Sequence, residues 1–160
     1  MSDAPYFRAG AGAVIYTETG KIVIFRRAGE EDIWQLQQGG MDANETPEDT
    51  LWRELYEETD LLKANFIEVT PYPDWILYSY PPEVRTTLKR PDTLGQVHRW
   101  WFLKLNPEVK IDLTKAQDQE FSDWKLVDFD ELLAARTTGW KFEVYKKLSD
   151  YFTDHIKPTL

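Results

Sequence analysis

The sequence contains no cysteine, and this absence excludes several classes of protein. Disulfide-stabilised scaffolds, zinc sites built from thiolates and enzymes with a cysteine nucleophile all need a side chain that the chain lacks. Histidine is scarce as well, since His98 and His155 are the only two. So few imidazoles give little support to a histidine metal site or a histidine general base. We expect both residues to be structural or solvent-facing.

Positive charge and long hydrophobic runs are also in short supply. The 28 acidic residues outnumber the 19 basic ones, which gives a formal net charge of −9 at pH 7. Because neutralisation of phosphates supplies most of the affinity for nucleic acids, a broad nucleic-acid-binding face is not expected. No apolar run approaches the ~20 residues that span a bilayer, and the N-terminus has no secretory signal. We expect a soluble, cytoplasmic protein that meets any polyanionic substrate locally.

The length and the hydrophobic pattern predict one domain of mixed structure. A chain of 160 residues, 42% of them hydrophobic, suits a single domain over residues 1–160, in which residues 1–7 form a flexible tail. A hairpin turn is expected at Gly20, a loop at residues 83–95, and a break with positive φ at Gly39 and Gly40. This order of elements indicates the α+β class or an α/β/α sandwich. Strands are predicted at residues 10–17, 21–27, 34–36, 65–70, 76–80, 96–105 and 121–127, and helices at residues 47–59, at 128–135 and from about residue 140.

The first predicted helix follows Thr46, a favourable N-cap, and carries an unusually acidic surface. Glu54, Glu57 and Glu58 are three and four positions apart, so their carboxylates share one face. Like charges at this spacing are unfavourable unless a cation neutralises them, and Mg²⁺ takes oxygen ligands of this kind. An isolated acidic helix face is more often simply solvated, so the neighbouring residues decide between the two interpretations.

Those neighbours resemble the Nudix box, a loop-helix-loop signature. Gly39, then Glu45, then residues 53–61 (RELYEETDL) place a glycine, an arginine, four glutamates and two aliphatic residues at the positions of the box. One position departs from it, because Asp60 stands where the box usually has glycine. Aspartate tolerates the left-handed geometry of a helix exit at some cost, so an altered helix end is expected, with no ligand lost.

The resemblance extends from about Arg8 to Phe152. Residues 34–40 (WQLQQGG) are similar to a WQxPQGG run of bacterial RNA 5′-pyrophosphohydrolases and plant-type dinucleoside polyphosphate hydrolases, with Gln37 in place of proline. The resemblance implies a Nudix-type α/β/α sandwich with a central mixed sheet. It also implies hydrolysis of a phosphoanhydride bond, either at the 5′-triphosphate of RNA or in a dinucleoside polyphosphate such as diadenosine tetraphosphate. The alternatives are ADP-ribose or nucleotide sugars as substrates, or an inactive nucleotide-binding module.

The resemblance also implies roles for individual residues. Mg²⁺, with Mn²⁺ as a substitute, would be bound by the backbone carbonyl of Gly39 and by the carboxylates of Glu54, Glu57, Glu58 and Glu120. Arg53 would orient a carboxylate such as Glu57, while Glu45 would support the loop. The base that takes a proton from the attacking water stays open among Glu57, Glu54 and, with less support, Glu120.

Substrate contacts complete the expected site. Arg8 and Arg27 resemble arginines that contact phosphate, and Tyr78 and Trp140 occupy positions where aromatic rings sandwich a base. The alternative for Trp140 is a core-facing position in the last helix, and the alternative for Arg27 is a solvated strand end. Gln96 and Lys141 are weaker candidates for substrate binding.

Overall fold

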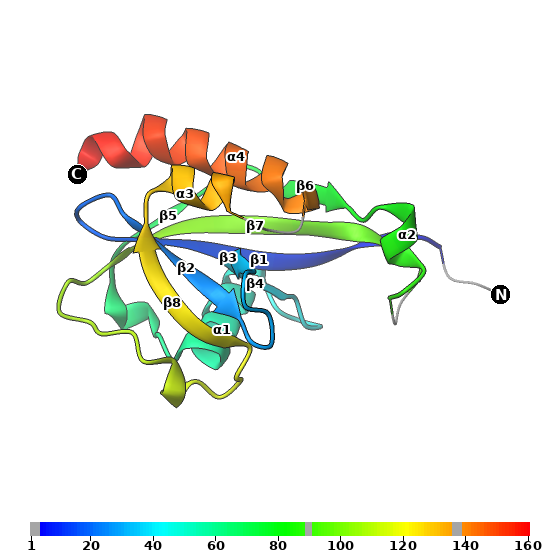
Figure 1. Ribbon diagram of the computed structural model, residues 1–160, viewed down its shortest axis with the longest axis horizontal. Coiled ribbons are helices and arrows are strands. Elements are labelled where there is room, and N and C mark those ends of the chain that lie inside the picture. The colour runs from blue at the N-terminus through cyan, green and yellow to red at the C-terminus, as the bar shows by residue number, and fades with distance from the viewer. Residues whose placement is uncertain (1–3, 89–90, 136–138) are drawn as a thin grey trace.

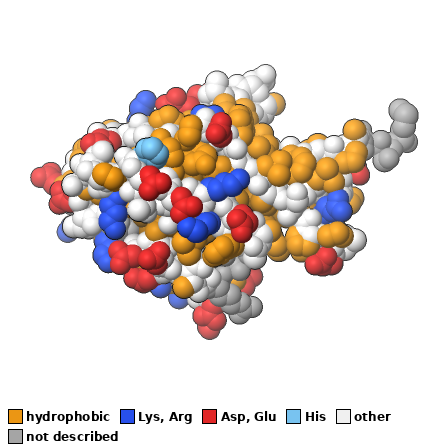
Figure 2. All heavy atoms as spheres, turned by 90° about the horizontal axis from the view of Figure 1, so that it is seen from above, with side chains coloured by type: hydrophobic (Ala, Val, Ile, Leu, Met, Phe, Trp, Pro, Cys, Tyr) orange, Lys and Arg blue, Asp and Glu red, His pale blue; other side chains and the backbone are white. Residues whose placement is uncertain are grey.

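The computed structural model describes residues 4–88, 91–135 and 139–160 (Figure 1). A twisted mixed sheet lies at the centre, with α1 on one face and α3 and α4 on the other (Figure 1). The α4 side of the molecule, seen in Figure 2, carries acidic, basic and hydrophobic side chains interspersed over the helix. None of the helices in the described ranges has the length and apolar character needed to cross a membrane. The helices are α1 (Pro47–Thr59), α2 (Pro82–Arg85), α3 (Phe129–Ala134) and α4 (Phe142–Tyr151), which a wider turn continues over Phe152–Ile156.

The sheet is built around two long parallel strands, β1 (Tyr6–Tyr16) and β7 (Thr93–Leu105). Its main order is β3-β2-β1-β7-β5, while β4 pairs with β1, β6 pairs with β7 and β8 pairs with β2. The other strands are β2 (Ile22–Arg27), β3 (Trp34–Gln35), β4 (Gln37–Gly40), β5 (Phe66–Pro71), β6 (Ile76–Ser79) and β8 (Phe121–Val127).

Strand β7 is central because both of its faces are covered. Trp100 and Phe102 are fully buried among residues of α3 and α4, while Leu103 is fully buried on the opposite face beside Leu51 and Leu55 of α1. Alternate residues of a strand point to opposite faces, so one strand contributes to two hydrophobic cores. The strand predicted at residues 96–105 is confirmed, although it begins three residues earlier than expected.

Helix α1 has the predicted bounds, and the residues at its ends explain them. The Thr46 hydroxyl accepts a hydrogen bond from the Asp49 amide, and the Asp49 carboxylate accepts one from the Thr46 amide. These two bonds form a capping box. At the other end Asp60 has φ 64° and ψ 12°, and its amide donates to the Tyr56 carbonyl. Asp60 thus keeps the left-handed exit that glycine would allow, and the altered helix end expected from the sequence is not found.

The predicted backbone break at Gly39 and Gly40 is wrong. Both lie in β4, paired with Ala11 and Gly10, and the glycines with positive φ are Gly20 and Gly29. The reason for glycine at position 39 is close approach, since a Cβ there would lie 2.2 Å from the Glu54 carboxyl carbon. Gly20, in contrast, has the expected role in the turn between β1 and β2.

Three further boundaries differ from the sequence predictions. Residues 6 and 7, placed in the flexible tail, belong to β1, where Tyr6 pairs with Thr93. The segment predicted as a loop contains α2, while Lys89 and Arg90 within it lie outside the described residues. Trp140 lies in the 3₁₀ turn η3 (Gly139–Lys141), so the last helix starts two residues later than predicted.

Candidate active site

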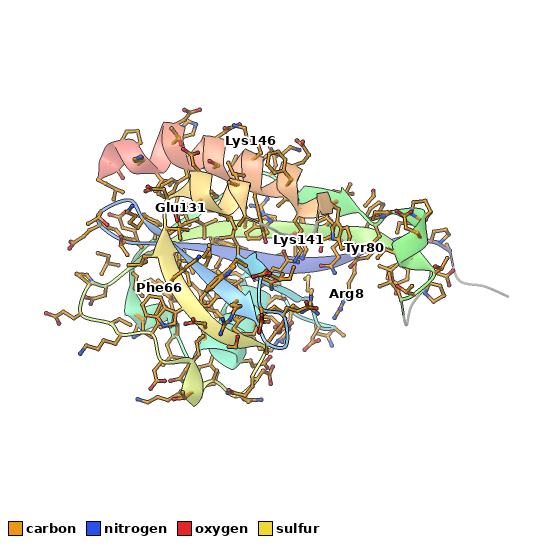
Figure 3. All side chains as sticks on the ribbon, in the orientation of Figure 1. Arg8, Phe66, Tyr80, Glu131, Lys141 and Lys146 are labelled. Carbon is orange, nitrogen blue, oxygen red and sulfur yellow. The ribbon has the colours of Figure 1, made fainter. Side chains whose placement is uncertain are left out.

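A cavity of about 490 Å³ opens between β1, β4, β6, β7, the end of α1 and the turn η3. Among the residues assigned to metal or substrate binding from the sequence, only Glu57 of α1 is not part of its lining, and Arg53 and Glu45 are not part of the lining either. Figure 3 shows Arg8, Tyr80 and Lys141 on the same side of the molecule, close to this cavity. The lining residues from the sequence prediction are Arg8, Arg27, Gly39, Glu54, Glu58, Tyr78, Gln96, Glu120, Trp140 and Lys141.

Arg53 holds the acidic side of the site together. Its guanidinium forms a two-pronged contact with Glu45, with Nε–Oε2 2.6 Å and Nη2–Oε1 2.9 Å. Nη1 donates to Glu54 at 2.9 Å and to Glu57 at 3.2 Å, which confirms the predicted i,i+4 pair. Nη2 also donates to the Gly40 carbonyl at 2.9 Å, so one side chain ties the helix to the strand.

The partners of Glu45 show why it supports the loop. Its carboxylate accepts hydrogen bonds from Arg53, the Asp42 amide and the Thr50 hydroxyl. The hydrogen bond from Arg53 is the main cause that lowers the pKa of Glu45 to about 2. Glu45 is therefore a charged anchor for Arg53, and its oxygens are occupied by protein donors.

Glu58 and Glu120 form the second acidic group. Glu58 is only 2% exposed and accepts a hydrogen bond from Gln37, whereas Glu120 comes from the exposed loop before β8. Burial, followed by the negative charge of Glu120, raises the pKa of Glu58 well above its usual range. Within the described parts of the chain, neither carboxylate forms an ion pair. Two neighbouring acids without a compensating cation are a suitable environment for a bound metal ion.

The donor set also fits magnesium chemically. Glu54 packs against the Gly39 backbone, and Glu58 lies one helical turn further along α1. Among the residues that the structure describes, no three acidic or histidine side chains converge into a complete metal cage. A divalent ion held here would therefore complete its shell with water and substrate phosphates, as Mg²⁺ usually does.

Basic side chains line another part of the cavity. Arg8 packs over Gly40, where a Cβ would lie 2.3 Å from the Arg8 guanidinium. Lys141 is half-buried, and burial, reinforced by the charge of Arg27, lowers its pKa to about 8. Arg8, Arg27 and Lys141 are three cations in one cavity, and together they can neutralise several phosphate charges although the whole chain is acidic.

The aromatic part of the cavity is held by two glutamine amides. Gln38 Nε2 donates to the Tyr78 hydroxyl at 3.2 Å, and Gln96 Nε2 donates to the Tyr80 hydroxyl. Tyr78 and Tyr80 meet edge to face with ring centroids 5.8 Å apart, and Trp140 meets Tyr80 at 6.1 Å. Trp140 lines the cavity and also packs against the core cluster, and its stacking on a base stays a prediction.

Several lining residues were missed from the sequence. Tyr80 could have been found, because it is two residues after Tyr78 and successive odd or even positions of a strand share a face. Val84 and Leu88 have helical spacing, four residues apart, but nothing in the sequence places them beside β6. The missed lining residues are Gln35, Gln38, Gly40, Tyr80, Val84 and Leu88.

The comparison with protein families matches residues 6–148 to the NUDIX domain. An RNA pyrophosphohydrolase of Shewanella sediminis is 33% identical over 159 residues, covering 99% of this chain and 91% of the relative. Another of Pseudoalteromonas atlantica is 35% identical over 153 residues, covering 95% of this chain and 87% of the relative.

Solved structures share the fold at lower sequence identity. The Escherichia coli dihydroneopterin triphosphate pyrophosphohydrolase superimposes with a TM-score of 0.70 at 19% identity, covering 89% of this chain and 97% of the other. A Caenorhabditis elegans Ap4A hydrolase complex superimposes with a TM-score of 0.64, also at 19% identity, covering 90% of this chain and 98% of the other. At these identities the likeness concerns the arrangement of sheet and helices.

Proposed function

The chain belongs to the Nudix family of hydrolases, and on that basis we propose that it removes pyrophosphate from the 5′-triphosphate end of RNA. The observation that carries this proposal is a single cavity that joins acidic side chains of the Nudix box, three basic side chains and an aromatic wall. Such a cavity offers separate surfaces to a metal ion, a polyphosphate and a base. The relatives with 33–35% identity bear the name RNA pyrophosphohydrolase.

The proposed metal is Mg²⁺, for which Mn²⁺ can substitute. The Gly39 carbonyl and the carboxylates of Glu54, Glu57, Glu58 and Glu120 would hold it. When bound, such an ion lowers the pKa of a water molecule and stabilises the charge that develops on phosphate oxygens.

The residues of the chain supply the proton transfer and the orientation. We assign the general base to Glu57 or Glu54, whose carboxylates are both fixed by Arg53 Nη1 at 3.2 Å and 2.9 Å. A base held in this way can accept the proton of the attacking water without first reorienting, which lowers the barrier. No covalent intermediate on the protein is required.

Substrate binding is assigned to the remaining walls of the cavity. Arg8, Arg27 and Lys141 would contact the phosphates, and Tyr78 and Trp140 would bind the base. Gln96 supports this surface by fixing the Tyr80 hydroxyl. Stacking on aromatic rings contributes ~1–3 kcal/mol per base with little sequence preference, so discrimination among bases should be weak.

A dinucleoside polyphosphate such as diadenosine tetraphosphate is the second candidate substrate. It is favoured by Val84 and Leu88, which extend the lining of the cavity from Tyr80 with apolar side chains. A second base could be buried there, whereas the 5′-triphosphate of RNA needs no such surface.

We also propose that residues 1–160 act as one domain in the cytoplasm, a location that suits a chain without cysteine.

The substrate proposal is tested by incubating the protein and Mg²⁺ with three substrates and identifying the products by mass. Pyrophosphate and a 5′-monophosphate end from triphosphorylated RNA support the first proposal. ATP plus AMP from diadenosine tetraphosphate, with RNA left intact, favour the second candidate. Cleavage of ADP-ribose alone would make both substrate assignments wrong, and cleavage of nothing would indicate a nucleotide-binding module.

A further inference from the structure

Residues 34–40 resemble a WQxPQGG motif, and Gln37 stands where that motif has proline. Gln37 lies at the acidic side of the site. It is fully buried in β4, where neighbouring side chains alternate between two faces. Gln38 and Gly40 face Tyr78 and Arg8, respectively. Gln37 and Gly39 therefore share the opposite face, which packs against α1.

The spacing of β4 matches the spacing of the carboxylates on α1. Two residues along a strand advance the chain by about 6.7 Å, and four residues along a helix advance it by about 6 Å. Gly39 lies against Glu54, and Gln37 lies against Glu58, four residues further along the helix. Each carboxylate thus has one residue of β4 opposite it.

The contact at Gln37 is a directed hydrogen bond. Its Nε2 donates to Glu58 Oε2 at 3.0 Å, and both side chains are buried. In the described structure its Oε1 has no hydrogen-bond partner, so the bond to Glu58 is the polar contact that this amide makes. A proline at this position would have no side-chain donor and could not hold the carboxylate in this way.

We propose that Gln37 is a positioning residue that holds Glu58 through Oε2, so that the other oxygen of Glu58 would stay available to a metal ion. This inference rests on the proposed function, because it assumes that Glu58 is a metal ligand. A carboxylate that binds a metal ion is deprotonated, and a hydrogen bond to the charged carboxylate is stronger than one between neutral groups and fixes the rotation of the carboxylate plane. Partners that orient a metal ligand typically change metal affinity by about 10–100-fold when removed.

The test is calorimetric titration of the substrate-free protein with Mn²⁺ alone, at one pH and ionic strength. Gln37→Met keeps the approximate shape without the donor, and Gln37→Pro introduces the residue of the resembling motif. We expect both to bind Mn²⁺ about 10–100-fold more weakly than the unaltered chain. Gln117→Met, at an exposed position of the loop before β8, is the matched control and should bind Mn²⁺ normally.

A double-mutant cycle with Glu58→Gln separates an effect of Gln37 on the position of Glu58 from a general destabilisation of the fold. If Gln37 acts through Glu58, Gln37→Met has no further effect on Mn²⁺ affinity once Glu58 is replaced. Mn²⁺ binding that stays within about twofold of the unaltered chain in Gln37→Met or in Gln37→Pro overturns the inference and leaves the proposed function intact. Equal losses in both backgrounds also overturn it, since the effect would then not pass through Glu58. An unaltered chain that takes up no Mn²⁺ overturns the proposed function together with this inference.

Discussion

At the scale of single residues, Arg53 has the largest influence on the geometry of the site. Its contacts reach the loop through Glu45, the helix through Glu54 and Glu57, and the strand through the Gly40 carbonyl. The helical spacing was sufficient to predict the contact with Glu57. The contacts with Glu45 and Gly40 depend on how the loop folds back over the helix, which the sequence pattern does not specify.

We predict that Arg53→Met lowers the free energy of unfolding by about 2–4 kcal/mol, because partly buried carboxylates lose their common partner. Arg53→Lys should recover only part of this loss, since an ammonium cannot reproduce the two-pronged contact with Glu45. Urea denaturation of the three proteins measures the effect. A lysine variant as stable as the unaltered chain would show that the fork geometry is unimportant.

His98 gives a prediction about pH. It is 1% exposed, and burial, followed by the charges of Lys141 and Arg8, lowers its pKa from 6.5 to about 3. Between these two pKa values the unfolded chain binds a proton that the folded chain does not bind. The stability that depends on neutral His98 is therefore complete above about pH 6.5 and is lost as the pH falls toward 3.

We predict that His98→Gln loses less stability than the unaltered chain when the pH is lowered from about 7.5 to about 5, by roughly 2 kcal/mol. The difference between the two proteins removes the contribution of other titrating groups. Denaturant unfolding at both pH values provides the measurement. Parallel pH profiles would mean that folding does not lower the pKa of His98.

At the scale of elements, the helices, strands and turns that neighbouring residues determine were predicted well. The N-cap at Thr46 predicted the start of α1, the turn at Gly20 predicted the first hairpin, and the hydrophobic pattern of residues 96–105 predicted most of β7. The pattern failed at Gly39 and Gly40, because two glycines indicate a break as readily as a strand that lies close to another backbone. The structure distinguishes the two explanations, because Glu54 lies against Gly39 and Arg8 lies against Gly40, which leaves no room for a Cβ.

The exit of α1 gives a prediction at this scale. Asp60 adopts the left-handed conformation at the negative end of the helix dipole, which disfavours both its Cβ and its charge. Asp60→Gly should therefore stabilise the protein by about 0.5–1 kcal/mol, while Asp60→Ala should destabilise it. Thermal unfolding of both variants tests the prediction, and stabilisation by alanine would contradict it.

At the scale of the whole molecule, the site depends on the meeting of distant segments. Arg8, Glu58, Glu120 and Lys141 come from different parts of the chain and line one cavity. The resemblance to a family collected these residues from the sequence, whereas composition and periodicity alone found only the acidic helix face. Glu120 in particular lies on an exposed loop that no local pattern ties to α1.

The net charge of −9 predicts how the protein responds to the length of an RNA substrate. Downstream phosphates therefore add little affinity, and we expect KM to change by less than about threefold between RNAs of about 3 and about 20 nucleotides. Steady-state kinetics at fixed salt and Mg²⁺ measure this. A KM that falls more than about tenfold with length would require a further RNA-binding surface.

The central claim is that carboxylates of α1 would hold a divalent metal ion and take the proton of the water that attacks a phosphoanhydride. It is tested most directly by the rate of pyrophosphate release from triphosphorylated RNA, with and without Mg²⁺, in the unaltered chain and in Glu57→Gln. We predict release that requires Mg²⁺ and that falls by about 10²–10⁴-fold in the variant, while its unfolding transition stays cooperative. Release at the same rate in Glu57→Gln, or release independent of Mg²⁺, would contradict this account.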